Sequence, residues 1–326
     1  MAYIEVVAGL VFLVFAGDYL VRGAVSLARR AGISKMIIAL TIVAFGTSAP
    51  ELMVGVDAVL KGAPTLALGN IVGSNIANVL LVVGLPAIIA PMTCTAPRIK
   101  KNLIIMLGAT ALFIGMAFSG TFTAIHGIAL LGTLAIFIGY SIARRKNCPM
   151  EAAAETADME ELQHKPDRYS IATLMVVGGL IGLIIGADLL VEGATAIAHD
   201  FGVSDAVIGL TLVALGTSLP ELMTAMMAAI RGHCEVAVGN VIGSNIFNLL
   251  CIGGAASTVG DIPVPASFLQ VDLWVMLGAS LLLIPFARSG ARMGKTAGIA
   301  MVVMYVGYIF YLAQSGESAS AMGMTL

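Results

Sequence analysis

The stretch TIVAFGTSAPELM (41–53) decides the fold, because it sets a glutamate and a proline inside an apolar run. The stretch TLVALGTSLPELM (211–223) repeats it almost letter for letter in the second half of the chain. A carboxylate such as Glu51 near the middle of a membrane-spanning segment costs at least about 2.5 kcal/mol. A proline there also removes a hydrogen bond from the helix. Two such unfavourable features, present twice, indicate a functional site.

The composition is that of a membrane protein. Of the 326 residues, 59% are hydrophobic and only 11% are charged, and the mean hydropathy is +1.00. Soluble domains are about 25% charged. We therefore expect the lipid bilayer to be the main partner, with no nucleic acid and no obligate protein partner. Neither a single surface-bound helix nor a barrel fits this pattern.

The apolar runs between turn and charge clusters predict an all-α polytopic membrane protein. Runs of about 20 apolar residues are long enough to cross the hydrocarbon core. The N-terminal MAYIEVV lacks the basic region of a signal peptide, so we expect the first run to be retained. The ten predicted spans are 2–28, 36–60, 67–90, 101–119, 123–143, 170–198, 205–230, 237–259, 267–287 and 296–314.

Lysine and arginine residues divide unequally between two sets of loops. Fifteen lie in or beside the loops that follow the odd-numbered spans, Lys61 alone lies in the other set, and Arg22 lies within the first span. Cytoplasmic loops carry the excess of basic residues. The pattern predicts a multi-pass protein of the plasma (inner) membrane with both termini on the non-cytoplasmic side.

The second half of the chain repeats the first at a constant offset in residue number, so that Thr41 corresponds to Thr211. A second block, GNIVGSNIANVLL (69–81), returns at the same offset as GNVIGSNIFNLLC (239–251). Each repeat holds five predicted spans, and an odd number means that the second copy enters the membrane from the opposite side. This arrangement predicts an inverted-repeat transporter whose helices are broken at the midplane, where the substrate binds.

The repeat divides the chain into three parts. The first five-helix repeat occupies 1–143, with its duplicated core at 41–80. The second occupies 170–326 and includes a short tail, with its core at 211–250. Residues 144–169 between them are short and charged, which predicts a cytoplasmic linker without a regulatory domain.

The first block brings oxygen atoms to one spot. In a helix, Thr47 and Ser48 share a face with Glu51, because residues three and four apart are neighbours. Pro50 cannot donate a hydrogen bond to the carbonyl of Gly46, which is left free for another partner. The second repeat supplies the same set with Thr217, Ser218, Glu221, Pro220 and Gly216.

The second block carries a polar stripe beside small residues. Asn70, Ser74 and Asn78 stand four residues apart, and Asn240, Ser244 and Asn248 repeat the stripe. Glycines at 69 and 73, and again at 239 and 243, allow another backbone to come close. The stripe fits a helix packed against the broken one.

The chemistry of these side chains favours calcium. Glu51 and Glu221 would repel each other in a dry site, and a divalent cation between them cancels that repulsion. Ca²⁺ takes about 6–8 oxygen ligands in irregular geometry, whereas Mg²⁺ keeps its waters and requires an octahedron. Softer metals are disfavoured, because neither block contains Cys or His. Two or three Na⁺ ions could occupy the same oxygens, and that competition would be the basis of exchange.

Several alternatives remain open from the residues alone. Ser, Thr and Asn often serve only as hydrogen-bonding contacts between membrane helices, and Ser48 or Asn70 taken singly fits that role. Asp18 and Asp188 are matched by the repeat; a structural or interfacial role is favoured, with Asp18 paired to Arg22, and a gating role is the alternative. A proton could replace sodium as the counter-ion. A passive channel is less favoured, and no motif of an enzyme appears in the spans.

The blocks GTSAPE…GNIVGSNIAN and GTSLPE…GNVIGSNIFN resemble the two alpha-repeats of the calcium/cation antiporter superfamily, which includes the prokaryotic sodium/calcium exchangers. The likeness covers nearly the whole chain. It implies alternating access, in which the first and sixth helices slide against the other eight. It also implies one Ca²⁺ site and up to three Na⁺ sites, with Ca²⁺ and Na⁺ as transported ions and no prosthetic group.

The resemblance also implies a role for each residue that matches the motifs. Glu51, Glu221, Thr47 and Thr217 would hold Ca²⁺. The flanking Na⁺ sites would be completed by Ser48, Ser218, Ser74 and Ser244, with the backbone carbonyls of Ala44 and Ala214, while Asn78 and Asn248 would flank the centre. Some members carry aspartate where this chain has Asn248 and Asn78, so the site here has two formal charges, which argues against K⁺ co-transport. The superfamily also contains proton-coupled members, so the counter-ion stays open.

Overall fold

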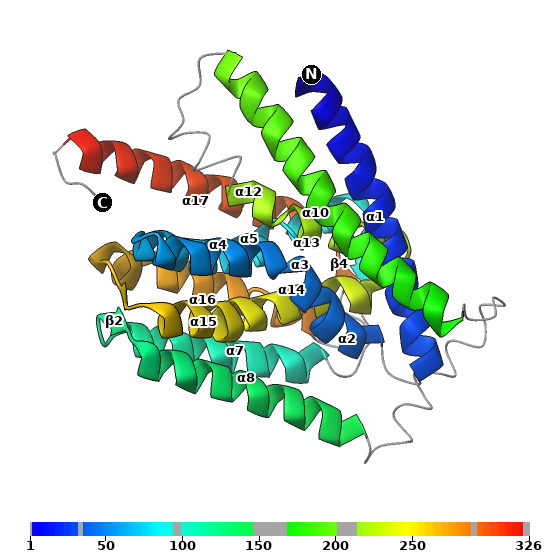
Figure 1. Cartoon of the computed structure of the whole chain (residues 1–326), viewed down its shortest axis with the longest axis horizontal. Helices are drawn as coiled ribbons and strands as arrows, with labels where there is room; N and C mark the ends of the chain where they lie inside the picture. The colour runs from blue at the N-terminus through cyan, green and yellow to red at the C-terminus, as the bar shows by residue number, and fades with distance from the viewer. Residues whose placement is uncertain are drawn as a thin grey trace.

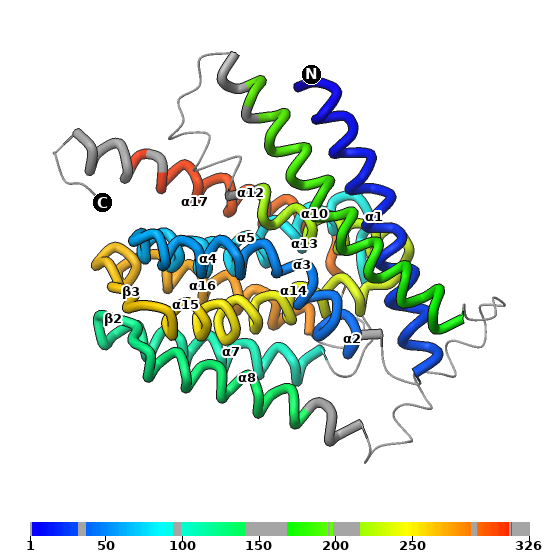
Figure 2. The backbone as a smooth tube through the Cα atoms, viewed as in Figure 1, coloured from blue at the N-terminus to red at the C-terminus, as the bar shows by residue number. Residues whose placement is uncertain are grey.

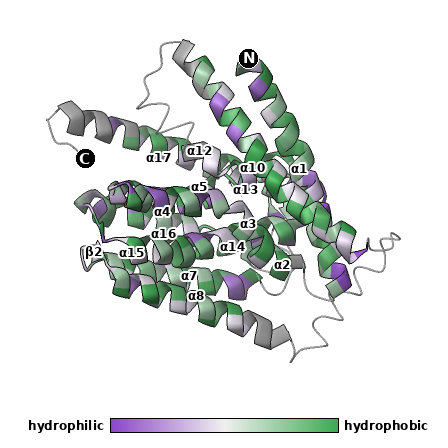
Figure 3. Ribbon diagram, viewed as in Figure 1, coloured by the Kyte–Doolittle hydropathy of each residue, from purple (hydrophilic) through white to green (hydrophobic). Residues whose placement is uncertain are grey.

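The chain is a helical bundle in a computed structural model (Figure 1). The structure describes residues 2–31, 35–93, 99–145, 168–200, 214–287 and 292–321. Most of the predicted linker, 146–167, lies outside these described residues. The ribbons are predominantly hydrophobic along their length (Figure 3), as expected of a membrane protein.

The first half contains long helices and one helix that is interrupted near its middle. In chain order the elements are α1 (Ala2–Ala31), α2 (Lys35–Ile38), the π-helix η1 (Ala39–Val43), α3 (Ala44–Thr47), α4 (Ala49–Leu60), α5 (Pro64–Leu80), α6 (Gly84–Ile89), β1 (Met92–Thr93), α7 (Ile99–Ala117), β2 (Thr121–Phe122) and α8 (Ala124–Arg145).

The second half repeats this order. Its elements are α10 (Tyr169–Asp200), α12 (Ala214–Thr217), α13 (Leu219–Ile230), α14 (Cys234–Phe247), the π-helix η3 (Asn248–Ile252), α15 (Gly253–Val259), β3 (Ile262–Pro263), the π-helix η4 (Phe268–Asp272), α16 (Leu273–Leu281), the 3-10 helix η5 (Pro285–Ala287), β4 (Arg292–Met293) and α17 (Lys295–Ala321). The bounds of α12 and α13 match those of α3 and α4 at the offset of the sequence repeat.

Seven helices in the described residues are long and apolar enough to cross a membrane, and the bent pair Ala39–Thr47 and Ala49–Leu60 makes an eighth. The count therefore falls short of the ten predicted spans. The predicted span 123–143 corresponds to a shorter apolar helix, Ala124–Tyr140. In the predicted span 205–230 the described apolar helix is Leu219–Ile230, and residues 201–213 lie outside the described part. The structure establishes a multi-pass helical membrane protein.

The helices α1 and α10 form a pair that lies at a steep angle to the rest of the bundle (Figures 1 and 2). The pair is antiparallel, because Gly9 near the start of α1 contacts Gly186 and Leu190, whereas Gly23 contacts Ala172 and Met175. A β-carbon on Gly9 would lie 2.6 Å from the backbone nitrogen of Leu190. The two backbones therefore touch, which only glycine permits at this spacing.

Each duplicated GTS-x-PE stretch breaks its helix at the serine. Ser48 has φ −85° and ψ 8°, and Ser218 has φ −88° and ψ 2°, so neither continues the α-helix. The following prolines lie in the first turn of α4 and α13, where a helix needs no N–H donor. The two halves of the first broken helix meet at a bend of 50°. The break predicted from Gly46 and Pro50 is confirmed, two residues before the proline.

The helices that carry the second block lie at the centre. In the apolar window of Cys234–Val259, 94% of the residues are buried, and 78% are buried in that of Pro64–Ile89. The corresponding share is 17% for Lys295–Leu312, whose apolar side chains face outward. Without a hydrophobic driving force in lipid, such central helices pack through small and polar residues.

Two short strand pairs join the repeats at their loops. β1 pairs antiparallel with β4, so that Met92 lies opposite Met293. β2 pairs antiparallel with β3, so that Phe122 lies opposite Ile262. Each pair therefore connects one loop of the first repeat with one loop of the second.

Candidate cation-binding site

The two glutamates lie at the centre of the bundle, at the start of α4 and α13. Glu51 is 1% exposed and Glu221 is 0% exposed. Each lies in the first turn of its half-helix, where the helix dipole stabilises a negative charge by about 0.3–1 kcal/mol. The two carboxylates are close enough to interact electrostatically. The predicted pairing of Glu51 with Glu221 is thus present in the structure.

A hydroxyl of the first repeat reaches the carboxylate of the second. Ser48 Oγ donates a hydrogen bond to Glu221 Oε1 at 3.0 Å, although 173 residues separate them. Ser244 Oγ approaches the same oxygen at 3.5 Å. The duplication therefore builds one composite site rather than two separate ones.

Several buried polar atoms at this centre have no hydrogen-bond partner within the described residues. They are Glu51 Oε2, Glu221 Oε2, Ser218 Oγ and both side-chain polar atoms of Asn78 and Asn248. Buried polar atoms in proteins are nearly always satisfied, and each exception needs an explanation such as an ion. Carboxylate oxygens and neutral oxygens are the ligands that a hard cation prefers.

Neutral side chains position the broken helix around this centre. Thr47 Oγ1 lies 3.3 Å from the carbonyl oxygen of Ala44 and 3.5 Å from Asn240 Oδ1. Asn70 Nδ2 donates to the backbone oxygen of Glu51 at 3.1 Å. The Ala44 carbonyl also accepts a hydrogen bond from the backbone N–H of Ser48 at 3.0 Å, so a cation at this carbonyl would share it with Thr47 and Ser48.

The remaining predicted residues fall around the same centre. Ser74 is buried on α5, and Thr217 ends α12 with its side chain half-buried. Ala214 begins α12, and its side chain lies outside the described set. Ser74 and Thr217 therefore lie on helices that contact the glutamate-bearing half-helices, whereas the roles of these residues as ligands stay predictions.

Three asparagines outside the predicted ligand set also belong to the centre. Asn240 lies against Thr47, as given above. Asn75 and Asn245 are repeat mates, and Asn245 Nδ2 donates to the backbone oxygen of Asn75 at 3.4 Å. A contact between two residues one repeat apart marks the pseudo-two-fold axis. For Asn75 and Asn245 the signal in the sequence is the GSN triplet of both blocks, although position alone does not single out its asparagine, whereas Asn240 belongs to the polar stripe named above.

The charge of the site and the chemical type of its side chains restrict which cation it could bind. Among the described residues, no group of three or more His, Cys, Asp and Glu side chains is arranged to hold a metal ion. The centre instead combines two carboxylates with hydroxyls and amides. Such an all-oxygen set suits Ca²⁺ or Na⁺ and disfavours softer metals.

An aspartate in place of Asn248 is expected to change the ion preference of the site. The substitution adds a third negative charge beside two carboxylates, so Ca²⁺ binding should strengthen by about tenfold or more relative to Na⁺. Competition between ⁴⁵Ca²⁺ and Na⁺ on the purified protein measures this ratio. Asn78→Asp, its repeat mate, should act in the same direction. An unchanged ratio in both variants would remove these asparagines from the site.

Comparison with known proteins places the chain in a family. The family model described as sodium/calcium exchanger protein matches residues 1–143 and 171–314, which is most of the chain. The sodium/calcium exchanger MaX1 of Methanosarcina acetivorans is 33% identical over 342 residues, covering 95% of this chain and 98% of MaX1. The inner membrane protein YrbG of Escherichia coli is 32% identical over 311 residues, covering 94% of each.

A solved structure shares the fold. The sodium/calcium exchanger from Methanococcus jannaschii superposes with a TM-score of 0.81 at 32% identity, covering 94% of this chain and 97% of that one. Crystals of that exchanger were soaked in Na⁺ with Ca²⁺ or Sr²⁺. The family model, the relatives and the fold agree, and the chain belongs to the sodium/calcium exchanger protein family of membrane transporters.

Proposed function

We propose that this protein exchanges Ca²⁺ for Na⁺ across the plasma membrane by alternating access and has no enzymatic activity. The observation that carries the proposal is the cluster of unsatisfied buried oxygens around Glu51 and Glu221, supplied by both repeats. A Ca²⁺ ion would neutralise both carboxylates at once. Without it, Na⁺ ions would occupy the same oxygens, so the two cations compete for one charge-balanced site.

The proposed division of ligands is the one that the family resemblance implies. Ca²⁺ lies between Glu51 and Glu221, with Thr47 and Thr217 beside it. Na⁺ ions use the flanking oxygens, where one carboxylate oxygen meets neutral hydroxyls and carbonyls. These flanking ligands are Ser48, Ser218, Ser74, Ser244 and the carbonyls of Ala44 and Ala214, with Asn78 and Asn248 flanking the centre. The family relatives named as sodium/calcium exchangers support this choice of ions.

The proposed topology is ten spans in two inverted repeats. It is supported by the antiparallel pair α1 and α10, which are repeat mates. It is also supported by the strand pairs, since β1 and β4 lie in loops predicted on one side and β2 and β3 in loops predicted on the other. The excess of basic residues then places both termini on the non-cytoplasmic side.

A proton is the second candidate for the counter-ion. Glu51 and Glu221 each present an oxygen without a hydrogen-bond partner in the described part of the chain. Such an oxygen can accept a proton as well as a metal ion. Proton-driven exchange would use the same two carboxylates and the same conformational cycle.

Proteoliposomes separate these candidates. Vesicles loaded with Na⁺ and diluted into Na⁺-free buffer at matched pH should take up ⁴⁵Ca²⁺, and dissipation of the Na⁺ gradient should stop the uptake. Vesicles with a pH gradient alone should show only the background of protein-free vesicles. Uptake driven by the pH gradient and indifferent to Na⁺ would overturn the sodium assignment, and the absence of uptake under either gradient would overturn calcium exchange.

A further inference from the structure

Two pairs of charged residues are related by the same repeat that relates the glutamates. Asp18 in α1 and Asp188 in α10 are repeat mates, and so are Lys61 and Arg231. Lys61 follows α4 with φ −85° and ψ 5°, and Arg231 follows α13 with the same angles. Each basic residue therefore ends the half-helix that begins with a site glutamate. Each repeat thus carries one aspartate on its long helix and one basic residue at the end of its half-helix.

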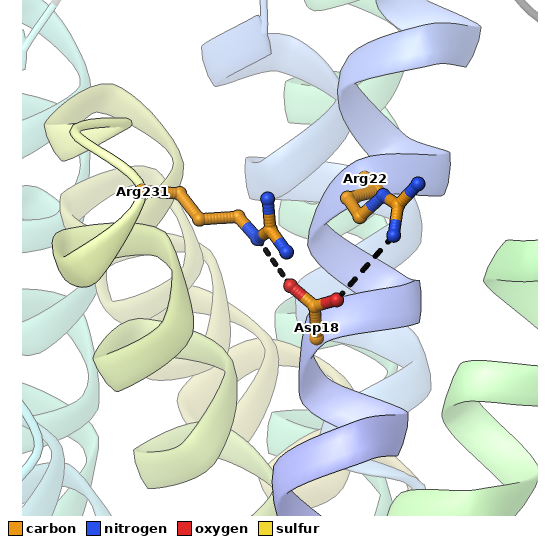
Figure 4. A network of polar contacts seen from close by, with 3 residues as sticks. All are labelled: Asp18, Arg22 and Arg231. Atoms are coloured by element: carbon orange, nitrogen blue, oxygen red, sulfur yellow. Dashed lines mark hydrogen bonds and ion pairs between the residues drawn. The ribbon is translucent and has the colours of Figure 1, made fainter.

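Asp18 and Arg231 form an ion pair between α1 and the bundle. Asp18 Oδ1 contacts Arg231 Nε, and Asp18 Oδ2 lies 3.6 Å from Arg22 Nη1 (Figure 4). The Asp18 side chain is 14% exposed, so the pair is partly shielded from solvent. Arg231 reaches across from the end of α13 to the long helix. The contact fixes α1 against the half-helix that carries Glu221.

The corresponding pair, Asp188 and Lys61, does not form an ion pair in the described residues. Asp188 is exposed on α10 and makes no ion pair within the described residues. Lys61 instead pairs with Asp57 on its own helix at 2.6 Å, and both side chains are more than half exposed. An exposed pair of this spacing shifts an equilibrium by only about twofold. Lys61 can therefore exchange Asp57 for another carboxylate at little cost.

The packing of apolar residues shows the same asymmetry. A β-carbon on Gly17 of α1 would lie 3.2 Å from the Met227 side chain and 3.3 Å from the Met223 backbone oxygen of α13. Met223 is half-buried, with α1 covering part of its surface. Its repeat mate, Met53 of α4, is 73% exposed. Among the described elements, α10 makes no extensive contact with α4. In the described residues α1 therefore packs along α13, whereas α10 contacts α3 more than the half-helix α4 that follows it.

We propose that the two pairs close the transporter alternately: Asp18 with Arg231 in the conformation seen here, and Asp188 with Lys61 in the opposite one. Sliding of α1 and α10 would separate the first pair and bring the second together. The inference rests on the proposed alternating access. It assigns Asp18 and Asp188 as positioning residues of the conformational cycle, which act without touching the transported ion.

Cysteine cross-linking of the full-length protein in vesicles tests the second contact, which the present conformation does not contain. The variant Asp188→Cys/Lys61→Cys should be bridged by a short bis-methanethiosulfonate reagent, which spans the distance that the long basic side chain covers, and Asp18→Cys/Arg231→Cys should be bridged as the positive control. Peptide mapping by mass spectrometry separates these cross-links from those of the native cysteines. Two helical turns displace residue 181 from residue 188 by about 10.5 Å along α10, beyond the reach of so short a reagent, so Ile181→Cys/Lys61→Cys should not be bridged.

Each cross-link should lower exchange at least tenfold, and a reductant, which releases the reagent, should restore it, because a locked transporter cannot alternate. Failure of residues 188 and 61 to cross-link, where residues 18 and 231 do, would overturn the proposal. The mapping does not depend on the transported ion. A 188–61 cross-link without Na⁺-driven Ca²⁺ uptake would therefore refute the proposed exchange and leave the alternating pairs standing.

Charge exchange gives a second, independent measurement. Asp188→Lys and Lys61→Asp should each slow exchange by about 2–5-fold, as expected for partly exposed ion pairs. The double variant should recover most of the rate, because the pair is restored with its charges exchanged. A double variant as slow as the product of the single effects would show that the two residues never meet, and would refute the pairing.

Discussion

Replacement of Glu51 or Glu221 by glutamine is expected to lower Ca²⁺ exchange by at least about 100-fold. Even changes to residues that only support the ligands cost metal sites about 10–100-fold in affinity, and each substitution here removes one of the two buried charges of the proposed site. Glutamine keeps the size of the side chain, so the bundle should fold. Na⁺-driven ⁴⁵Ca²⁺ uptake and calorimetric Ca²⁺ binding measure the loss.

Asp272→Asn is the matched control for these variants. Asp272 is another buried carboxylate in an apolar helix, but its partner is Tyr308, whose hydroxyl donates to Asp272 Oδ1 at 2.8 Å. Asparagine keeps that acceptor, and exchange should stay within about twofold of the unchanged protein, since the remaining effect is one hydrogen bond. Exchange near the original rate in either glutamate variant, in protein that elutes as a single folded species, would contradict the site.

Gly243→Ala is expected to disable transport through packing. A β-carbon at Gly243 would lie 2.6 Å from the backbone oxygen of Leu40 and 2.6 Å from the β-carbon of Ala44. Neither neighbour is the flexible end of a side chain, so α14 must move away from the broken helix. Overpacking of this kind costs about 1–3 kcal/mol. Ca²⁺ ligands lie at about 2.3–2.6 Å, so a displacement of several tenths of an ångström should lower exchange at least tenfold.

Thermal unfolding and ⁴⁵Ca²⁺ uptake on the same preparation separate the two effects of Gly243→Ala. Gly115→Ala on α7 is the control, because Gly115 is exposed and no described atom lies within 4 Å of a β-carbon there. That variant should be as active as the original and up to about 1 kcal/mol more stable, as alanine favours helix. If Gly243→Ala transports normally, the close contact between α14 and the first broken helix is not needed for ion binding.

The broken helices and the central glutamates could be predicted from the sequence because local chemistry determines them. Pro50 has no N–H, so the helix must restart near it, and the break lies at Ser48. The constant repeat made Glu221 the expected partner of Glu51. The described residues carry eight of the ten predicted spans if the bent pair is counted as one, and the other two predicted spans contain the shorter apolar helices Ala124–Tyr140 and Leu219–Ile230. The ten-span arrangement stays a prediction.

Contacts between residues far apart in the chain could not be predicted from the sequence. The spacing of four residues predicted that Asp18 pairs with Arg22, and it does at 3.6 Å. The contact of Asp18 with Arg231, 213 residues away, depends on how α1 packs against α13. The π-helices Ala39–Val43 and Asn248–Ile252 were also not predicted, since their composition does not differ from that of the neighbouring α-helical residues. The contact between Asn75 and Asn245 likewise exists only in the folded protein.

The two strand pairs limit which parts of the molecule can move relative to one another. Each pair fastens a loop of one repeat to a loop of the other, and neither includes a residue of α1 or α10. The halves created by duplication are therefore tied together and cannot rock as separate bodies. We expect the boundary between framework and moving part to cut across the duplication, with one helix from each half leaving its own repeat to travel with its counterpart.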